Sequence, residues 1–164
     1  MSAIYKNLSD FSDTSVPSAK GYRFGVIVAE WNREITEKLF EGARQTLLDN
    51  GAEEQAITRI NVPGSFELVA GAQLLALRED YNAIICLGCV IQGETRHFEF
   101  ICQAVASGLT QLTVKYERPF VFGVLTPDTM QQALERAGGK HGNKGDEAAV
   151  TAIKMAALQE SLSR

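Results

Sequence analysis

A chain of 164 residues, of which 45% are apolar, is long enough to bury the core of one domain. The formal net charge of −4 excludes a protein-wide positive field, so neither nucleic acid nor an anionic membrane surface is an expected partner. No apolar run reaches the length of a membrane span, and the polar first twenty residues lack the apolar stretch of a secretory signal. The three cysteines, an odd number, predict reduced thiols and a cytoplasmic location.

The first half of the chain predicts two strands that alternate with two helices. Tyr22–Ala29 is short, β-branched and almost wholly apolar, which predicts a buried strand. Between Ile35 and Leu48, apolar residues recur at steps of three and four, so a helix is expected, with Gly51 as its stop. Ala56–Val62 predicts a second strand and Ser65–Arg78 a second helix.

The second half continues the alternation and adds a final helix. Its predicted elements are the strand Ala83–Ile91, the helix His97–Tyr116, the strand Phe120–Leu125, a helix that ends near Gly138-Gly139, and a helix over about Asp146–Leu162. Asp128 is the expected N-cap of the fourth helix, with Gln131 completing a capping box. Alternating strands and helices predict a parallel sheet covered on both faces, with residues 1–20 as an arm and 21–164 as one domain.

Ligands of open α/β sheets bind beyond the carboxyl ends of the strands. That rule selects the segments Trp31-Asn32, Gly64-Ser65-Phe66-Glu67, Gly93-Glu94-Thr95-Arg96-His97 and the turn after Leu125.

The aromatic and acidic residues of the first two segments each allow two interpretations. Trp31, the only tryptophan, is either a packing residue over the sheet edge or a flat platform for a heteroaromatic ring, and Phe66 is equally ambiguous. Glu67 lies near a helix start, where the dipole favours a carboxylate, but it could also accept hydrogen bonds from ligand hydroxyl groups.

The third segment combines a helix start with a histidine. Backbone N–H groups around Gly93, Glu94 and Thr95 would form an anion site at the N-terminus of the following helix. His97 is either an ordinary polar residue or, beside such a site, a group that transfers protons.

Four cationic or titratable residues cluster between two predicted helices and are separated by glycines. These are Arg136, Lys140, His141 and Lys144. A solvated loop would explain them, but glycines also allow close approach of a ligand, and a guanidinium suits phosphate. The Cys86–Cys89 pair, in contrast, is not expected to be redox-active or to bind zinc, because residues three apart on a strand point to opposite faces and no second pair exists.

Taken together, five motifs resemble those of lumazine synthases. They are Trp31-Asn32, Val62–Glu67, Gly88–Glu99, Phe122–Thr126 and Gln132–Gly145, in family order and spacing. The resemblance extends from about Gly21 to the C-terminus, and five motifs together are highly specific. Trp31 stands where many relatives have Phe, Gln92 where many have Arg, and His141 where Ala is usual.

The resemblance implies a flavodoxin-like three-layer sandwich whose four parallel strands have the order 2-1-3-4. It implies condensation of 5-amino-6-(D-ribitylamino)uracil with 3,4-dihydroxy-2-butanone 4-phosphate to 6,7-dimethyl-8-ribityllumazine, with release of phosphate and water, in riboflavin biosynthesis. No metal or organic cofactor is expected. The active site would lie between adjacent subunits of a homopentamer, which in some relatives forms a sixty-subunit capsid, and an association with riboflavin synthase would follow.

The resemblance also implies a role for each site residue. Trp31 would stack on the pyrimidine and His97 would shuttle protons, while the substrate-binding residues of the same subunit would be Asn32, Gly64, Ser65, Phe66, Glu67, the backbone of Cys89, Val90 and Ile91, and, for the phosphate, Gly93, Glu94 and Thr95. Phe122, Arg136 and Lys144 would come from the neighbouring subunit, with Arg136 on the phosphate. Two rival functions are a flavodoxin-like flavin carrier, which would leave His97 and Arg136 without a role, and a cage scaffold without catalysis.

Overall fold

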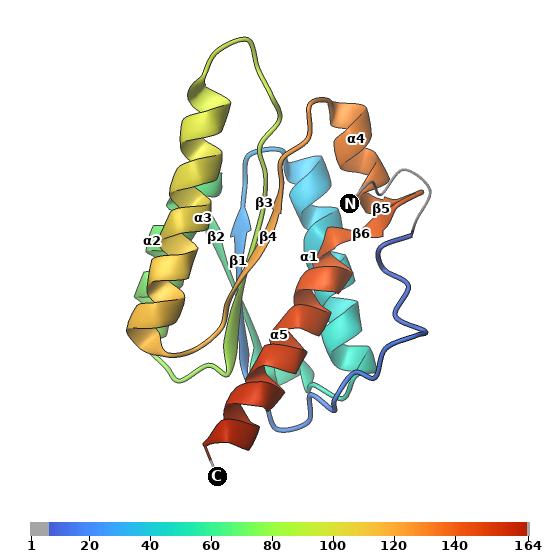
Figure 1. Ribbon diagram of the computed structural model, residues 1–164, viewed down its shortest axis with the longest axis vertical. Coiled ribbons are helices and arrows are strands. Elements are labelled where there is room, and N and C mark those ends of the chain that lie inside the picture. Colours follow the sequence, from blue (N-terminus) through green and yellow to red (C-terminus); the bar gives the residue numbers. More distant parts are fainter. Residues whose placement is uncertain (1–6, 164) are drawn as a thin grey trace.

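Four parallel strands in the order β2-β1-β3-β4 form the centre of the structure, a computed structural model that describes residues 7–163 (Figure 1). The strands are β1 (Phe24–Ala29), β2 (Ile57–Val62), β3 (Ala83–Cys89) and β4 (Phe120–Leu125). The predicted flavodoxin-like fold and its strand order are thus confirmed.

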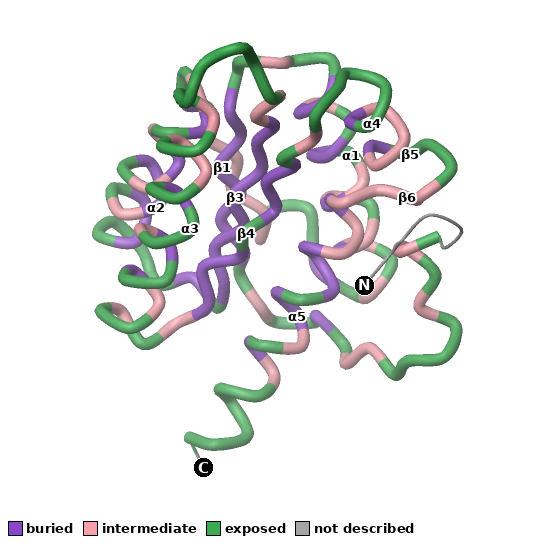
Figure 2. Tube along the Cα trace, turned by 45° about the horizontal axis from the view of Figure 1, so that its top comes forward, coloured by how far each residue is buried: buried purple, intermediate pink, exposed green. Residues whose placement is uncertain are grey.

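Helices cover both faces of this sheet. On one face lie α1 (Arg33–Asp49) and α5 (Lys144–Leu162), and on the other lie α2 (Leu68–Ala76) and α3 (His97–Tyr116) (Figure 1). Successive strand residues point to opposite faces, so each face builds its own apolar cluster. β1 and β3 are buried throughout and β4 nearly so, whereas β2 at the edge of the sheet is mostly half-buried and the outer helix surfaces are largely exposed (Figure 2).

The cysteines of β3 demonstrate this alternation. Cys86 belongs to the cluster under α2 and α3, whereas Cys89 belongs to the cluster under α1 and α5, as predicted. Burial raises the pKa of both thiols, that of Cys89 to about 12, which suppresses the reactive thiolate. Within residues 7–163, no group of three or more His, Cys, Asp or Glu side chains could hold a metal ion.

The predicted cap of the fourth helix is wrong by one residue. Thr129, not Asp128, caps α4 (Met130–Glu135): its hydroxyl accepts from the Gln132 N–H, and the Gln132 side-chain oxygen accepts from the Thr129 N–H. The capping box therefore lies one residue later than predicted, because Thr129 has the extended backbone that an N-cap needs. The helix predicted from Ser65 does begin there, as a 3₁₀ turn, η2 (Ser65–Glu67), that becomes α-helical at Leu68.

A small hairpin replaces the expected end of the fourth helix. α4 ends at Glu135, and β5 (Ala137–Gly139) pairs antiparallel with β6 (Gly142–Asn143). Gly138 and Gly142 have φ of 99° and 83°, which a helix cannot accommodate and which glycine adopts readily. Asn143 then caps α5 through its side chain, which accepts from the Gly145 N–H, so α5 begins two residues before the predicted Asp146.

The described part of the predicted arm, residues 7–20, contains no helix or strand and runs from the hairpin and the start of α5 to the C-terminal end of α1, where the Ala19 N–H donates to the Asn50 carbonyl (Figure 1). The Leu8 N–H donates to the His141 carbonyl at 3.1 Å, and the Ser9 hydroxyl accepts from the Asn143 N–H at 2.6 Å. Residues 1–6 of the arm lie outside the described residues. No helix within the described part of the chain is long and apolar enough to cross a membrane.

Candidate active site

A cavity of about 600 Å³ opens at the carboxyl ends of β1, β2 and β3, beside the start of α3. It is lined by Trp31, Asn32, Gly64, Ser65, Phe66, Glu67, Cys89, Val90, Ile91, His97 and Ile101. The structure thus gathers ten of the predicted site residues from four separate segments. The strand-end rule predicted this location.

The two aromatic residues of this cavity present their rings to solvent. Trp31 is 74% exposed and Phe66 is 55% exposed, so neither ring covers the core. The Trp31 backbone is fixed nevertheless, because its N–H donates to the Pro63 carbonyl at 3.0 Å. A rigid backbone that carries an exposed ring suits stacking against a flat ligand.

Hydrogen bonds link the carboxyl ends of β1, β3 and β4. Asn32 has a left-handed backbone with φ of 62°, and its side-chain amide donates to the Cys89 carbonyl at 2.9 Å. The Val90 N–H donates to the Leu125 carbonyl at 2.8 Å. Of the backbone groups expected at the pyrimidine edge, the Cys89 carbonyl and the Val90 N–H are therefore already engaged within the protein.

Ser65 and Glu67 lie on the turn that follows β2. Ser65 is only 6% exposed and packs directly over β3, where a Cβ atom on Gly88 would come within 2.5 Å of the Ser65 Oγ. Gly88 is therefore required for this close approach. The Glu67 carboxylate accepts from the Gly64 N–H at 3.0 Å, which stabilises the turn and fixes the carboxylate at the cavity wall.

The predicted phosphate loop rises beyond the cavity, between β3 and α3 (Figure 1). Gly93, Glu94 and Thr95 are exposed and do not belong to the cavity lining. The Thr95 hydroxyl accepts a long, 3.4 Å hydrogen bond from the His97 N–H. His97 is exposed, opens α3 and lines the cavity, so its imidazole is accessible to a ligand there.

The three remaining predicted residues do not line this cavity. Phe122 and Lys144 line a hollow of about 350 Å³ between β4 and α5, and Arg136 lines another of about 410 Å³ beside α4. Since β4 is an outer strand of the sheet, Phe122 lies at its free edge, where it is 36% exposed. One chain therefore carries two groups of site residues that face different hollows.

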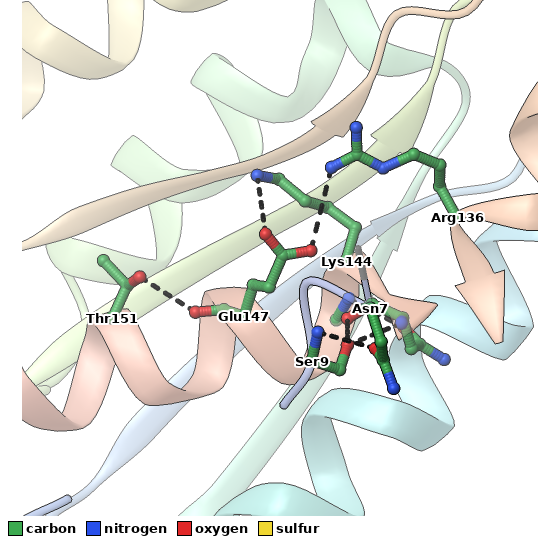
Figure 3. Close-up of polar contacts among 8 residues, drawn as sticks. Asn7, Ser9, Arg136, Lys144, Glu147 and Thr151 are labelled. Atoms are coloured by element: carbon green, nitrogen blue, oxygen red, sulfur yellow. Dashed lines mark hydrogen bonds and ion pairs between the residues drawn. The ribbon is translucent and has the colours of Figure 1, made fainter. Parts of the chain in front are cut away.

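Ile101 of the Trp31 cavity and Glu147 beside the cations were absent from the sequence-based set. Ile101 adds an apolar wall one helical turn after His97, and that spacing of four is a signal the sequence contains. Glu147 lies between Arg136 and Lys144, with its carboxylate oxygens 3.8 Å and 3.7 Å from their nitrogens (Figure 3). Glu147 follows Lys144 by three residues, a spacing that could have suggested an ion pair between them. An acidic residue in the first turn of a helix, however, is ordinarily explained by the helix dipole.

The glycines around the cationic cluster serve protein packing. A Cβ atom on Gly145 would lie 1.9 Å from the Leu39 carbonyl, and one on Gly139 would lie 2.7 Å from the Glu135 Cα. The close approaches that these glycines permit are thus between backbone segments. They hold α5 against α1 and fold the hairpin back onto α4.

Comparisons with known proteins agree with this geometry. The family model for 6,7-dimethyl-8-ribityllumazine synthase matches residues 21–160. A protein of that name from Cytophaga hutchinsonii is 58% identical over 96% of this chain and 98% of its own length. Proteins of the same name from Parabacteroides distasonis and Porphyromonas gingivalis are each 54% identical, over 94% and 97% of this chain and 97% and 99% of their own lengths.

Proposed function

This chain belongs to the 6,7-dimethyl-8-ribityllumazine synthase family, and we propose that the cavity at Trp31 and His97 is its active site. The protein is a transferase of riboflavin biosynthesis. It condenses 5-amino-6-(D-ribitylamino)uracil with 3,4-dihydroxy-2-butanone 4-phosphate and releases 6,7-dimethyl-8-ribityllumazine, phosphate and water. The observation that supports the site most strongly is the convergence of ten expected residues on one cavity.

In this proposal the cavity binds the ribitylamino-pyrimidine. Trp31 stacks on the ring, and its 74% exposure in the free protein leaves a face available. Asn32, Ser65 and Glu67 bind the ribityl hydroxyl groups, and Phe66 and Ile101 supply apolar walls. The Glu67 carboxylate is fixed by the turn after β2, and the Asn32 side chain by its bond to the Cys89 carbonyl, so their free oxygens accept from hydroxyl donors without further ordering.

The sugar phosphate binds where the loop at Gly93, Glu94 and Thr95 meets cations of a neighbouring subunit. Backbone N–H groups before α3 favour an anion, and Arg136 offers a planar fork of donors to phosphate oxygens. Phe122, Arg136 and Lys144 line hollows other than the Trp31 cavity of their own chain, which supports a site shared between subunits.

The chemistry needs proton transfers and a stabilised leaving group. The uracil amine attacks the ketone, and loss of water gives an imine. Phosphate then leaves by β-elimination, and ring closure with loss of a second water completes the product. His97 exchanges protons in these steps, which suits an imidazole near neutral pH. Arg136 stabilises the departing phosphate, and the orientation of two reactants that condense readily supplies much of the acceleration.

A test of this proposal follows product formation and phosphate release by the purified protein and by His97→Ala. We expect the wild type to form lumazine and phosphate in equal amounts. The variant should turn over about 10²-fold more slowly, at the low end for an acid–base group, because orientation survives. The other histidine provides a matched control, and His141→Ala should remain close to wild type. A wild type without turnover, or equal losses in both variants, would contradict the proposal.

We further propose that the assembly is a homopentamer that builds a sixty-subunit capsid, works in the cytoplasm and associates with riboflavin synthase. The divided site supports a ring, and the short hairpin between α4 and α5, which carries no insertion, supports the capsid. Three free cysteines support a reducing compartment. Mass measurement in solution tests the assembly directly.

A further inference from the structure

Glu147 lies between the two cations of the composite site, and no sequence motif assigned it a role. It occupies the first turn of α5, one residue after Asp146. The hydrogen bonds of Asp146 are with Thr46 of α1 and Ser9 of the arm. The Glu147 carboxylate extends instead toward Arg136 and Lys144 (Figure 3). A preference for acids at a helix start does not explain this second, specific placement.

The geometry of these three side chains is unusual for an ion-pair cluster. One carboxylate oxygen is 3.8 Å from an Arg136 Nη atom, and the other is 3.7 Å from the Lys144 Nζ atom. Both distances exceed that of a hydrogen bond. The Arg136 Nε and one Glu147 oxygen are buried without a hydrogen-bond partner. Glu147 therefore attracts both cations while leaving their donors uncommitted.

Partial burial makes this attraction effective. The side chains of Arg136, Lys144 and Glu147 are 31%, 27% and 20% exposed, so water and salt screen their charges less than at an open surface. Without the carboxylate, two partly buried cations would repel each other across the space that it now occupies. They would separate toward solvent, away from the positions in which they meet one phosphate.

We propose that Glu147 is a positioning residue for phosphate capture: it holds Arg136 and Lys144 at a common position and does not touch the substrate. This inference rests on the proposed function only in the identity of the substrate. For the affinity of the site for phosphate, positioning and Coulomb attraction predict opposite effects of removing the Glu147 charge. Glu147→Gln removes a negative charge beside an anion site, so Coulomb attraction alone predicts tighter phosphate binding. Positioning predicts weaker binding.

The test compares the wild type with Glu147→Gln in the assembled protein. We expect the KM for the butanone phosphate to rise about tenfold, as for a displaced binding group, while the KM for the uracil substrate stays unchanged. The inhibition constant of inorganic phosphate should rise by the same factor. Glu147→Asp keeps the charge but cannot reach both cations, so it should weaken phosphate binding as well. An unchanged or lowered KM for the phosphate substrate in Glu147→Gln overturns the proposal.

Two further measurements separate this proposal from other causes. Glu41→Gln is the matched control. The Glu41 carboxylate lies 3.8 Å from the guanidinium of Arg44, three residues later on α1, so its loss removes a similar ion pair outside the site and should leave both KM values unchanged. In a Lys144→Ala background, where no second cation remains to repel Arg136, Glu147→Gln should raise the KM for the butanone phosphate much less than it does in the wild type. If the wild type makes no product, the proposed function fails, but calorimetric titration with inorganic phosphate still tests Glu147 by the same comparison.

Discussion

Trp31 combines a fixed backbone with an exposed ring, and this combination gives the site a direct optical signal. It is the only tryptophan of the chain, so all tryptophan emission reports on the entrance of the cavity. A ribityl-pyrimidine analogue that stacks on the indole should quench this emission strongly, because the ring would pass from water to contact with a heteroaromatic face.

A fluorescence titration measures this quenching. Inorganic phosphate alone should leave the emission unchanged, and Trp31→Phe should abolish the signal while retaining an aromatic platform and turnover. Unchanged emission at saturating analogue would show that the indole does not contact the pyrimidine.

The residues at the strand ends were predictable because two independent arguments selected them. The rule for open α/β sheets gave their location, and family motifs gave their types. Glu147 and Gly88 were not predictable in the same way. An acid in a first helical turn and a glycine in an apolar strand each have an ordinary local explanation, and only the positions of Arg136 and Ser65 in space reveal what they contact.

At the scale of elements, the start of α5 half-buries the carboxylate of Asp146, with consequences for stability. Burial raises the pKa of Asp146, with a smaller upward contribution from the charge of Glu147, while hydrogen bonds from Thr46 and Ser9 oppose the rise. Since the folded pKa exceeds the unfolded value near 3.8, the folded state retains the proton more strongly. The stability that Asp146 contributes is fully present below the unfolded pKa and is lost as the pH rises through the folded pKa.

Denaturant unfolding between pH 3.5 and about 7 tests this sign. The free energy of unfolding of Asp146→Asn, relative to the wild type, should increase as the pH rises, because the variant has no buried carboxylate to ionise. Asp13→Asn, at an exposed position of the arm, is the control. A relative stability of Asp146→Asn that falls with rising pH would mean that the hydrogen bonds from Thr46 and Ser9 outweigh burial.

Most elements were predicted from periodicity, but three details were not. The fourth cap lies at Thr129 rather than Asp128, since two adjacent polar residues can both cap and only the backbone conformation selects one. The hairpin β5–β6 depends on the left-handed backbone of Gly138 and Gly142. In the sequence, the pair Gly138-Gly139 near a helix end equally predicts that the helix simply stops. The early start of α5 follows from its cap, Asn143. The sequence alone did not identify this cap, because it does not show that the hairpin ends at Asn143.

At the scale of the whole molecule, the proposed division of the site between subunits can be tested by complementation. Glu67 lines the cavity and Arg136 lies elsewhere on the same chain, so in a ring each interface would combine the Glu67 of one subunit with the Arg136 of the next. Glu67→Ala and Arg136→Ala should each be nearly inactive alone. After joint unfolding and refolding at equal amounts, about a quarter of the interfaces should carry both intact faces and regain activity.

Mixing the two folded variants without exchange should recover nothing, which controls for residual activity. Mass measurement of the refolded sample establishes that mixed rings have formed. If such rings show no more activity than the pure variants, Glu67 and Arg136 do not act on one ligand across an interface, and the site belongs to a single chain.

The position of α5 in the fold also bears on how the chain is made. The four strands are complete at residue 125, yet the face of β3 and β4 opposite α3 is covered by α5, which follows all four strands along the chain. A nascent chain can therefore pair its strands in order but exposes the apolar side chains of Leu87 and Val121 until Ala149 and Ile153 emerge. Folding of the sheet into a sealed core must then wait until α5 has been synthesised, so the interval between synthesis of β4 and of α5 is when the nascent chain most needs protection from aggregation.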